Sequence, residues 1–529
     1  MHRRSLLAGT TALAATVRLA APALAQPAGA RTLVHVPQAN LTSLDPVWTT
    51  AVVSRNAAGL MFETLFGRDE SLAAKPQMLE GFSMEDGARR WTMRLREGLL
   101  FHDGEPVLAR DCVASLKRWM VRDPIGQTIA DRLGSLEAPD DRTLVWRLNK
   151  PFPSLAYALA KTQPSPVIMP ARIAATDPYR QIQEIIGSGP FRWVPDEYVP
   201  GSRAVWARND RYRPRDEPVS FCAGGLRAMV DRVEWQIIPD AGTAASALMN
   251  GEVDWVDQPI PDLLPRLRRA RGVTVGLLDE HGTIAVLRPN QLHGPTANAA
   301  IRRAMLAAID PEEVMTAVMG TDRRLWRAPV GFFLPGTPSA NDAGMELVRT
   351  RRSPDAVKAM LAEAGYGGEP ILFMHPSDQT FYDAISNVAV ASFRKVGLNI
   401  DDVHMDWGTV VQRRTKKDTV DKGGWSIFPA GFPAAEYRDP VFATGIRGNG
   451  AAAWFGWPED PVIERMRDTW METTDEAEIK RLDREIQARA FETLPYFPLG
   501  QYLPQAGWRS ALRGLLKGPV PVFWNVTKG

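Results

Sequence analysis

Hydrophobic positions follow two different periods along the first part of the chain. Alternate residues of 91–95 are apolar, which predicts a half-buried strand. The same alternation returns over 140–148. Between these segments, after the turn signal Asp103-Gly104, an apolar stripe predicts an amphipathic helix over 111–120. We therefore expect strands and short helices to be mixed in this part of the chain.

Helical periodicity dominates from about residue 296 to residue 493. Short polar residues stand before the helical stretches, and Pro follows three of them at the first helical position. The predicted caps are Thr296, Asp310 (in a capping box), Ser353 and Asp460. Gly365 stands where a left-handed residue would end the third helix, and a strand is predicted over 371–374.

The tail after Pro495 is strand-like and Pro-rich again, as in the first third of the chain. We therefore expect an α/β protein of two lobes. Lobe I comprises residues 26–290, lobe II is inserted as residues 291–490, and residues 491–529 return to lobe I. Two crossings of the chain would then join the lobes.

The N-terminus has the order of a secretory signal. Arg3-Arg4 precedes an Ala- and Leu-rich run, and Ala23-Leu24-Ala25 is a small-x-small cleavage site. The Arg pair resembles a twin-arginine export signal, with an ordinary secretory signal as the alternative. Arg18 excludes a membrane anchor of about 20 uncharged residues. We expect residues 1–25 to be removed near Ala25 and the mature protein to be periplasmic, without membrane insertion.

Composition narrows the class of protein. Of the 529 residues, 45% are hydrophobic and 23% charged, which is typical of soluble globular proteins and excludes disordered and collagen-like chains. Without the three arginines of the signal, 60 basic residues face 61 acidic ones. A nearly neutral chain gives no reason to expect nucleic acid as a partner. Cys112 lies on the apolar face of a predicted helix, so a buried free thiol is expected there, and a bridge to Cys222 is the alternative.

Motifs of catalysis are missing from the sequence. It has no nucleophile elbow, no phosphate loop and no dinucleotide fingerprint, and its seven His residues show no metal-ligand spacing. We expect neither enzymatic activity, nor a cofactor, nor a metal. An exported chain of two lobes without a catalytic set indicates a binding protein whose ligand lies in a cleft between lobes.

The segment 91–118 is similar to a signature of the family 5 extracellular solute-binding proteins of ABC importers, which include dipeptide, oligopeptide and nickel-chelate receptors. Its core is Leu-Arg-Glu-Gly, then Phe-His-Asp-Gly-Glu-Pro. Supporting marks are Leu44-Asp45-Pro46, Gly187-Ser188-Gly189-Pro190-Phe191 and Asn250-Gly251-Glu252-Val253-Asp254. The resemblance implies a two-lobe periplasmic binding protein fold (class II-like, cluster C type) with an extra subdomain at about 70–185. It also implies a monomer that serves an inner-membrane ABC permease.

The resemblance also suggests ligand contacts. In peptide-binding members, an extended segment after Leu-Asp-Pro lies along the ligand, which points to Thr50 and Val52. A carboxylate shortly before an acidic-Pro pair holds the ligand's ammonium, and Glu436 has that spacing here, with Glu in place of the usual Asp. Arg438 and Arg447 are candidates for a ligand carboxylate.

Trp425 and Phe428 precede this acid and could form an apolar wall of the pocket, with ordinary core packing as the alternative. The ligand class stays open at this point. A peptide is expected, and nickel chelates, haem, opines, glutathione and sugars are alternatives. An exported enzyme with a cofactor is the alternative from a different class, but it would need a cofactor motif.

Overall fold

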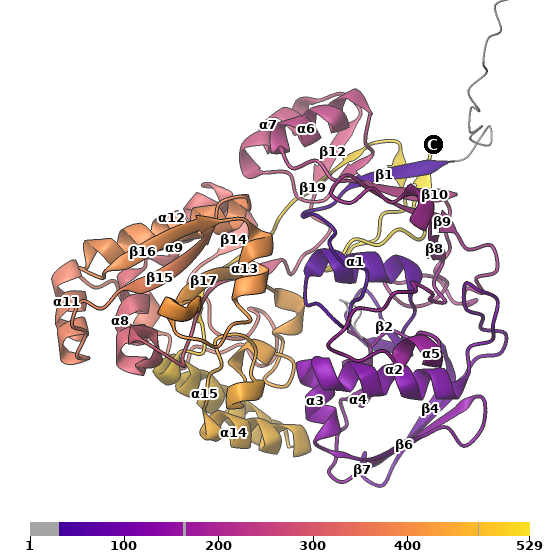
Figure 1. The fold of residues 1–529 in the computed structure, drawn as a ribbon, viewed down its shortest axis with the longest axis horizontal. Coiled ribbons are helices and arrows are strands. Elements are labelled where there is room, and N and C mark those ends of the chain that lie inside the picture. The colour runs from indigo at the N-terminus through magenta and orange to yellow at the C-terminus, as the bar shows by residue number, and fades with distance from the viewer. Residues whose placement is uncertain (1–30, 162–165, 474) are drawn as a thin grey trace, which may run out of the picture.

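A computed structural model describes residues 31–161, 166–473 and 475–529, which form two large β-sheets with helices around them (Figure 1). The predicted signal sequence and its cleavage site lie outside these residues. Within the described ranges, no helix is both long and apolar enough to cross a membrane.

The first sheet has seven strands, and one of them, β19, comes from the C-terminal tail of the chain. In spatial order the strands are β12 (Val273–Gly276), β19 (Ala506–Arg509), β11 (Trp255–Val256), β1 (Thr32–Val36), β10 (Arg232–Gln236), β9 (Arg203–Arg208) and β8 (Phe191–Trp193). The helices α1 (Val52–Met61), α6 (Ala241–Asn250) and α7 (Leu264–Arg269) belong to the same part of the chain. Short pairs complete it: β2 (Phe66–Arg68) with β3 (Ala74–Pro76), and β20 (Leu512–Arg513) with β21 (Thr527–Lys528).

A separate four-stranded antiparallel sheet lies within residues 79–148. Its order is β4 (Leu79–Glu85), β5 (Arg90–Leu95), β7 (Thr143–Leu148) and β6 (Leu133–Glu137), with α2 (Ala109–Arg122), α3 (Pro124–Ala130), α4 (Leu155–Leu159) and α5 (Ala171–Ala174) nearby. The predicted strands and helix are therefore confirmed as β5, β7 and α2. Cys112 of α2 is fully buried and both cysteines are free, so the expectation of a buried free thiol is confirmed as well.

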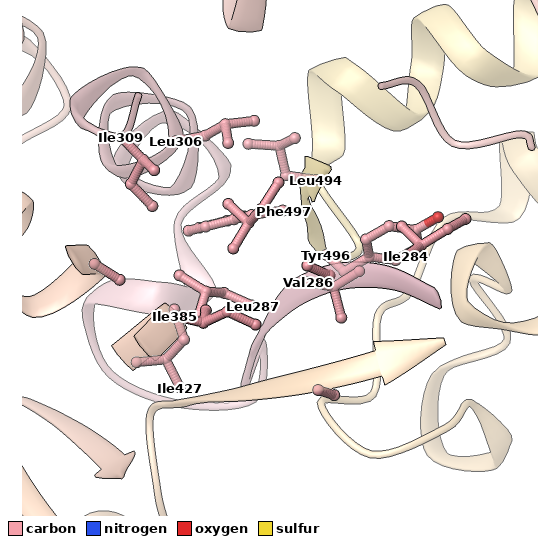
Figure 2. Packing of buried hydrophobic residues seen from close by; sticks show 14 of the residues in the cluster. Ile284, Val286, Leu287, Leu306, Ile309, Ile385, Ile427, Leu494, Tyr496 and Phe497 are labelled. Carbon is pink, nitrogen blue, oxygen red and sulfur yellow. The ribbon is translucent and has the colours of Figure 1, made fainter. Parts of the chain in front are cut away.

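The second large sheet has six strands and a hydrophobic core of its own. Its order is β14 (Trp326–Arg327), β18 (Phe497–Tyr502), β13 (Thr283–Pro289), β17 (Ile427–Pro433), β15 (Ile371–Pro376) and β16 (Ile400–Met405). Its helices are α8 (Ala299–Ala308), α9 (Pro311–Met319), α10 (Glu346–Arg349), α11 (Pro354–Glu363), α12 (Thr380–Lys395), α13 (Trp407–Arg413), α14 (Pro461–Glu472) and α15 (Glu476–Thr493). Figure 2 shows Leu287 and Ile427 of the sheet packing with Leu306 of α8 and Ile385 of α12.

Three of the four predicted helix caps are confirmed. The side chains of Asp310, Ser353 and Asp460 each accept a hydrogen bond from the first turn of α9, α11 and α14. The prediction for α8 was wrong, because its cap is Asn298, whose Oδ1 accepts from the Ala300 amide at 2.8 Å. Thr296 is instead fully buried and donates its hydroxyl to the Asn290 carbonyl.

Two crossings connect the sheets and lie side by side. The chain passes from β12 to β13 through residues 277–282 and returns from β18 to β19 through 503–505. Gly282 has φ +65°, and a Cβ there would lie 2.1 Å from the Tyr502 carbonyl oxygen, so only glycine allows this approach. The Gln501 side chain donates to the His281 carbonyl at 2.6 Å. Because β13 and β18 belong to the six-stranded sheet, the crossings lie outside the expected boundaries at 290/291 and 490/491. We propose that lobe I and lobe II meet at these crossings and turn about them.

Candidate ligand-binding site

Six charged residues gather where the two lobes meet, and we call them the interlobe charge cluster: Arg55, Arg68, Asp123, Lys161, Glu436 and Arg438. Asp123 lies 2.8 Å from Lys161 and 3.8 Å from Arg55; Asp123 and Arg55 are buried, and Lys161 is half-buried. Burial alone would raise the pKa of Asp123, but Lys161 and Arg55 together lower it to about 2. This carboxylate therefore stays ionised and holds two lobe I cations in place.

Lobe II contributes Glu436, which ends the 3-10 turn η6 (Ala434–Glu436) directly after β17. The tight turn points its carboxylate at Arg68 of β2, at 3.4 Å, and the Glu436 side chain is 12% exposed while that of Arg68 is fully buried. Both contacts between these groups are longer than the 2.7–2.9 Å that is typical of a strong charge-assisted hydrogen bond. This pair joins lobe II to lobe I across the boundary between them.

Tyr157 connects the two arginines of the cluster that flank Glu436. The Arg68 guanidinium lies 3.9 Å above the Tyr157 ring, and Arg438 donates to the Tyr157 hydroxyl at 3.4 Å. The structure therefore brings Glu436 and Arg438, two of the predicted site residues, to one place. The cluster holds four cationic side chains and two carboxylates, and two further acidic residues lie beside it, namely Asp439 next to Arg438 and Glu63 in the lining of the cavity that Arg55 and Lys161 share.

The predicted extended segment is shorter in the structure than the resemblance implied. Residues 46–48 form a turn, and Val52 is the first residue of α1 rather than part of a strand. Only residues 49–51 are left without regular structure. Thr50 does reach the lobe boundary, because its hydroxyl accepts a hydrogen bond from Arg414 of lobe II at 3.2 Å.

Arg414 is a residue that the sequence reasoning missed. It follows α13, is 5% exposed, and lies over the ring of Phe455 at 4.7 Å. Among the described residues, no carboxylate is within ion-pair distance of Arg414, and its Nε has no hydrogen-bond partner. Burial lowers its pKa to about 10, so it remains charged at neutral pH. With 63 Lys and Arg in the chain, no local signal marked this one.

Trp425 and Phe428 lie in the core of lobe II rather than beside Glu436. They are 2% and 0% exposed, and their rings contact each other at 5.0 Å. Phe428 also contacts Trp454, whose ring faces the Arg414 guanidinium at 5.5 Å. Trp425 and Phe428 therefore pack in the core next to Trp454, the ring that faces Arg414.

A cavity of about 50 Å³ adjoins the cluster on the lobe I side, and it has space for a few water molecules only. Arg55 and Lys161 line it together with Gly67 and Trp524. All of its lining residues come from lobe I, so this cavity is not the space between the lobes.

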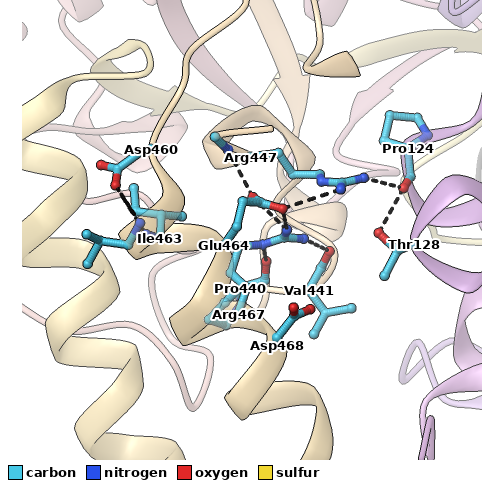
Figure 3. A network of polar contacts seen from close by, with 12 residues as sticks. Pro124, Thr128, Pro440, Val441, Arg447, Asp460, Ile463, Glu464, Arg467 and Asp468 are labelled. Atoms are coloured by element: carbon cyan, nitrogen blue, oxygen red, sulfur yellow. Dashed lines mark hydrogen bonds and ion pairs between the residues drawn. The ribbon is translucent and has the colours of Figure 1, made fainter. Parts of the chain in front are cut away.

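Further contacts join the lobes at their lower ends in Figure 1. Arg447 donates to the Pro124 carbonyl at 2.8 Å, and Figure 3 shows that Glu464 of α14 lies between Arg447 and Arg467. Arg132 lies 2.5 Å from Asp468. The two lobes are therefore in direct contact here as well.

Comparison with known proteins adds independent information. The family described as "Bacterial extracellular solute-binding proteins, family 5 Middle" matches residues 73–452. A "Probable peptide ABC transporter periplasmic-binding protein y4tO" of Sinorhizobium fredii is 36% identical over 524 residues, 98% of each chain. The periplasmic oligopeptide-binding protein OppA of Escherichia coli is 24% identical, with 90% of this chain and 87% of that protein covered.

Solved structures share the fold at low identity. The binding protein AgaA of A. tumefaciens R10 in complex with agropinic acid has a TM-score of 0.80 at 19% identity and covers 94% of this chain and 99% of its own. The protein DppA of Helicobacter pylori in complex with the peptide STSA has a TM-score of 0.79 at 19% identity, with 94% and 98% covered. The two-lobe α/β fold predicted from the sequence is thereby confirmed.

Proposed function

Because this chain belongs to the family 5 bacterial extracellular solute-binding proteins, we propose that it captures a peptide or peptide-like solute between its lobes and delivers it to an ABC permease. The mature chain would begin near Gln26 and act in the periplasm as a monomer, without catalysing a reaction. The name of the relative that is 36% identical over almost the whole length supports a peptide as the ligand.

The observation that carries this proposal is the position of Glu436 at the lobe boundary. Its carboxylate is mostly buried and lies 3.4 Å from Arg68 of lobe I. In a closed cleft from which water is excluded, a carboxylate binds an ammonium strongly. We propose that Glu436 receives the ligand's amino group when the lobes close.

We propose that Arg414 binds the carboxylate at the other end of such a ligand. A buried guanidinium without a carboxylate partner among the described residues is costly, and a ligand carboxylate could accept two parallel hydrogen bonds from it. Thr50 lies beside this guanidinium and Val52 follows two residues later, so both would line the path of the ligand. Arg438 would complete the site at the Glu436 end.

The test uses Glu436→Gln, which keeps the shape of the side chain and removes its charge. The probe is the tightest binder from a panel of dipeptides to pentapeptides, measured by calorimetry in its free, N-acetylated and C-amidated forms. Loss of a desolvated charge pair costs about 2–5 kcal/mol, or roughly 30-fold or more in affinity. Wild type should therefore discriminate against the acetylated peptide, and Glu436→Gln should lose this discrimination.

Matched variants separate the two ends of the ligand. Arg414→Gln should lose discrimination against the amidated peptide only, and Glu363→Gln, an exposed carboxylate of lobe II, should behave as wild type. Equal binding of the free and acetylated peptides by wild type would show that Glu436 does not bind the ammonium. A panel in which no peptide binds would overturn the peptide as ligand class.

A second candidate is an acidic solute, which the four cationic side chains of the interlobe charge cluster would attract. The solved structure of AgaA with agropinic acid shows that this fold accommodates one. Glu436→Gln distinguishes the candidates by sign, because removal of a negative charge should strengthen the binding of an anionic solute and weaken that of a cationic one.

A further inference from the structure

Two histidines and an aspartate meet on one face of the parallel pair β15–β16, at the edge of the lobe II sheet. His375 of β15 is the register partner of His404 of β16, so their side chains lie on the same face. Asp402 precedes His404 by two residues on the same strand and therefore points the same way. Strand pairing brings these residues together, although 29 positions separate His375 from His404.

The ligand atoms of these side chains are close enough for one ion. His375 Nδ1 lies 2.9 Å from one oxygen of Asp402, and His404 Nε2 lies 3.4 Å from the other. The ligand atoms of all three residues lie within 4.8 Å of one another. Two ligands about 2.1 Å from a common ion, at angles of about 90–110°, would be roughly 3.0–3.4 Å apart.

A second carboxylate holds the ring of His375 in orientation. His375 Nε2 lies 2.9 Å from Oδ1 of Asp383 on α12, and Asn387 of the same helix donates to the other oxygen of Asp383 at 3.1 Å. A histidine that binds a metal almost always donates its other ring N–H to such a carboxylate. Asp383 therefore fixes the ring so that Nδ1 points at Asp402.

We propose that His375, His404 and Asp402 bind a divalent first-row transition-metal ion of the zinc class, with Asp383 as the partner that orients His375. Two imidazoles and one carboxylate are a ligand set for Zn²⁺, whereas Mg²⁺ and Ca²⁺ prefer oxygen ligands alone. His375 is fully buried and is therefore held in place, whereas His404 is 56% exposed and leaves the site open to a metal ion from solvent. Water would complete the coordination.

This site is separate from the proposed ligand contacts. It lies on the edge strand β16 and its neighbour β15 in lobe II, and none of its residues belongs to the interlobe charge cluster. The ion would join β15 to β16 and would not take part in capture of the solute. The proposed metal site therefore does not depend on which class of ligand binds between the lobes.

The experiment is calorimetric titration of the tag-free, chelator-treated mature protein with ZnCl₂, with MgCl₂ as the comparison ion. We expect one Zn²⁺ per chain and no Mg²⁺ binding. His404→Ala, at an exposed position that tolerates truncation, should weaken Zn²⁺ binding at least 100-fold. Asp383→Asn should weaken it about 10–100-fold, as is usual for an orienting partner. His293→Ala, an exposed histidine elsewhere in lobe II, should bind as wild type.

Cobalt supplies an independent readout of the ligand set. Co²⁺ in place of Zn²⁺ should give visible absorption bands of a four-coordinate site with nitrogen and oxygen ligands, and these bands should disappear in His404→Ala. Zn²⁺ binding that His404→Ala and Asp402→Asn leave unchanged would overturn the proposal. Failure of the wild type to bind Zn²⁺ more tightly than Mg²⁺ would overturn it as well.

Discussion

His35 of β1 is a histidine in a hydrocarbon environment. It is fully buried, and its ring contacts those of Trp235, Trp255 and Phe523 at 5.3, 4.9 and 5.1 Å. Neither ring nitrogen has a hydrogen-bond partner among the described residues. Burial lowers the pKa of His35 to about 3, because the charged form would lose its hydration without compensation.

This burial predicts that His35 makes the fold sensitive to acid. In the unfolded chain His35 binds a proton near pH 6.5, but in the folded protein it does so only near pH 3. The unfolded state therefore gains stability as the pH falls through this window, and the free energy of unfolding decreases. Between pH 7.5 and 4.5 the loss due to this residue should be roughly 2–3 kcal/mol.

His35→Phe should remove that loss, because phenylalanine does not titrate. Denaturant unfolding of both proteins at pH 7.5 and 4.5 measures the difference, and His293→Phe at an exposed position serves as control. If wild type and His35→Phe lose the same free energy on acidification, His35 is not the residue responsible.

Single residues differ in how far the sequence reveals them. The caps Asp310, Ser353 and Asp460 were predictable because their partners lie two or three positions away along the chain. The role of Arg414 was not, because its hydroxyl partner Thr50 is 364 positions away. Glu436 was located through a family motif, but the arginines around it come from other segments and could not be read from that motif.

At the scale of single elements, α14 shows how one carboxylate attaches a helix to the rest of lobe II. Glu464 accepts from Arg467 at 3.0 Å and from the Gly448 amide at 2.9 Å, and it lies 3.3 Å from Arg447 (Figure 3). Both arginines are buried, and burial lowers the pKa of Arg467 to about 10. Arg467 also donates to the carbonyls of Pro440 and Val441, which continue the chain from the proposed site.

Glu464→Gln should destabilise the protein strongly, because it leaves two buried guanidinium groups without their carboxylate. Breaking a buried pair from one side typically costs about 3–5 kcal/mol, and denaturant unfolding at pH 7.5 measures it. Glu478→Gln removes the carboxylate of a surface pair with Arg481 on α15 and should leave stability unchanged. Similar effects of the two variants would show that the Glu464 network is not structural.

At this scale the sequence predicted elements better than it predicted their neighbours. The alternation in 91–95 and 140–148 revealed β5 and β7, because each strand has one buried face. Val52 was misplaced in an extended segment, since the resemblance carried over the segment but not the point at which α1 begins. The pairing that brings His375 beside His404 depends on sheet order, which no local pattern contains.

Away from the crossings the two lobes touch through polar contacts and through a buried apolar cluster, in which Val441, Phe442 and Met471 of lobe II pack with residues of the range 65–168. The pair of Arg132, which is 5% exposed, with Asp468, which is 49% exposed, is one of the polar contacts. A contact of this kind contributes only about 0–1 kcal/mol, so its charge can be reversed without loss of the fold.

Asp468→Lys should shift the ligand-free protein toward the open arrangement, because it places two positive charges at the lobe boundary. We expect a larger radius of gyration in small-angle scattering and weaker ligand binding, with an unchanged melting temperature. Asp342→Lys reverses a charge whose partners Arg349 and Arg484 lie within lobe II, so it should not alter the radius. If the radius of Asp468→Lys equals that of wild type, this contact does not contribute to closure.

The position of β19 between β12 and β11 has a consequence for how the protein is made. The ribosome finishes β12 at Gly276 but reaches Ala506 only 230 residues later. At about 5–20 residues per second, this delay is roughly 10–50 seconds. During that time all strands of the lobe II sheet are synthesised, while the lobe I sheet still lacks the strand that attaches β12. The lobe that begins first is thus completed last, and a nascent chain interrupted before residue 506 exposes two unpaired strand edges.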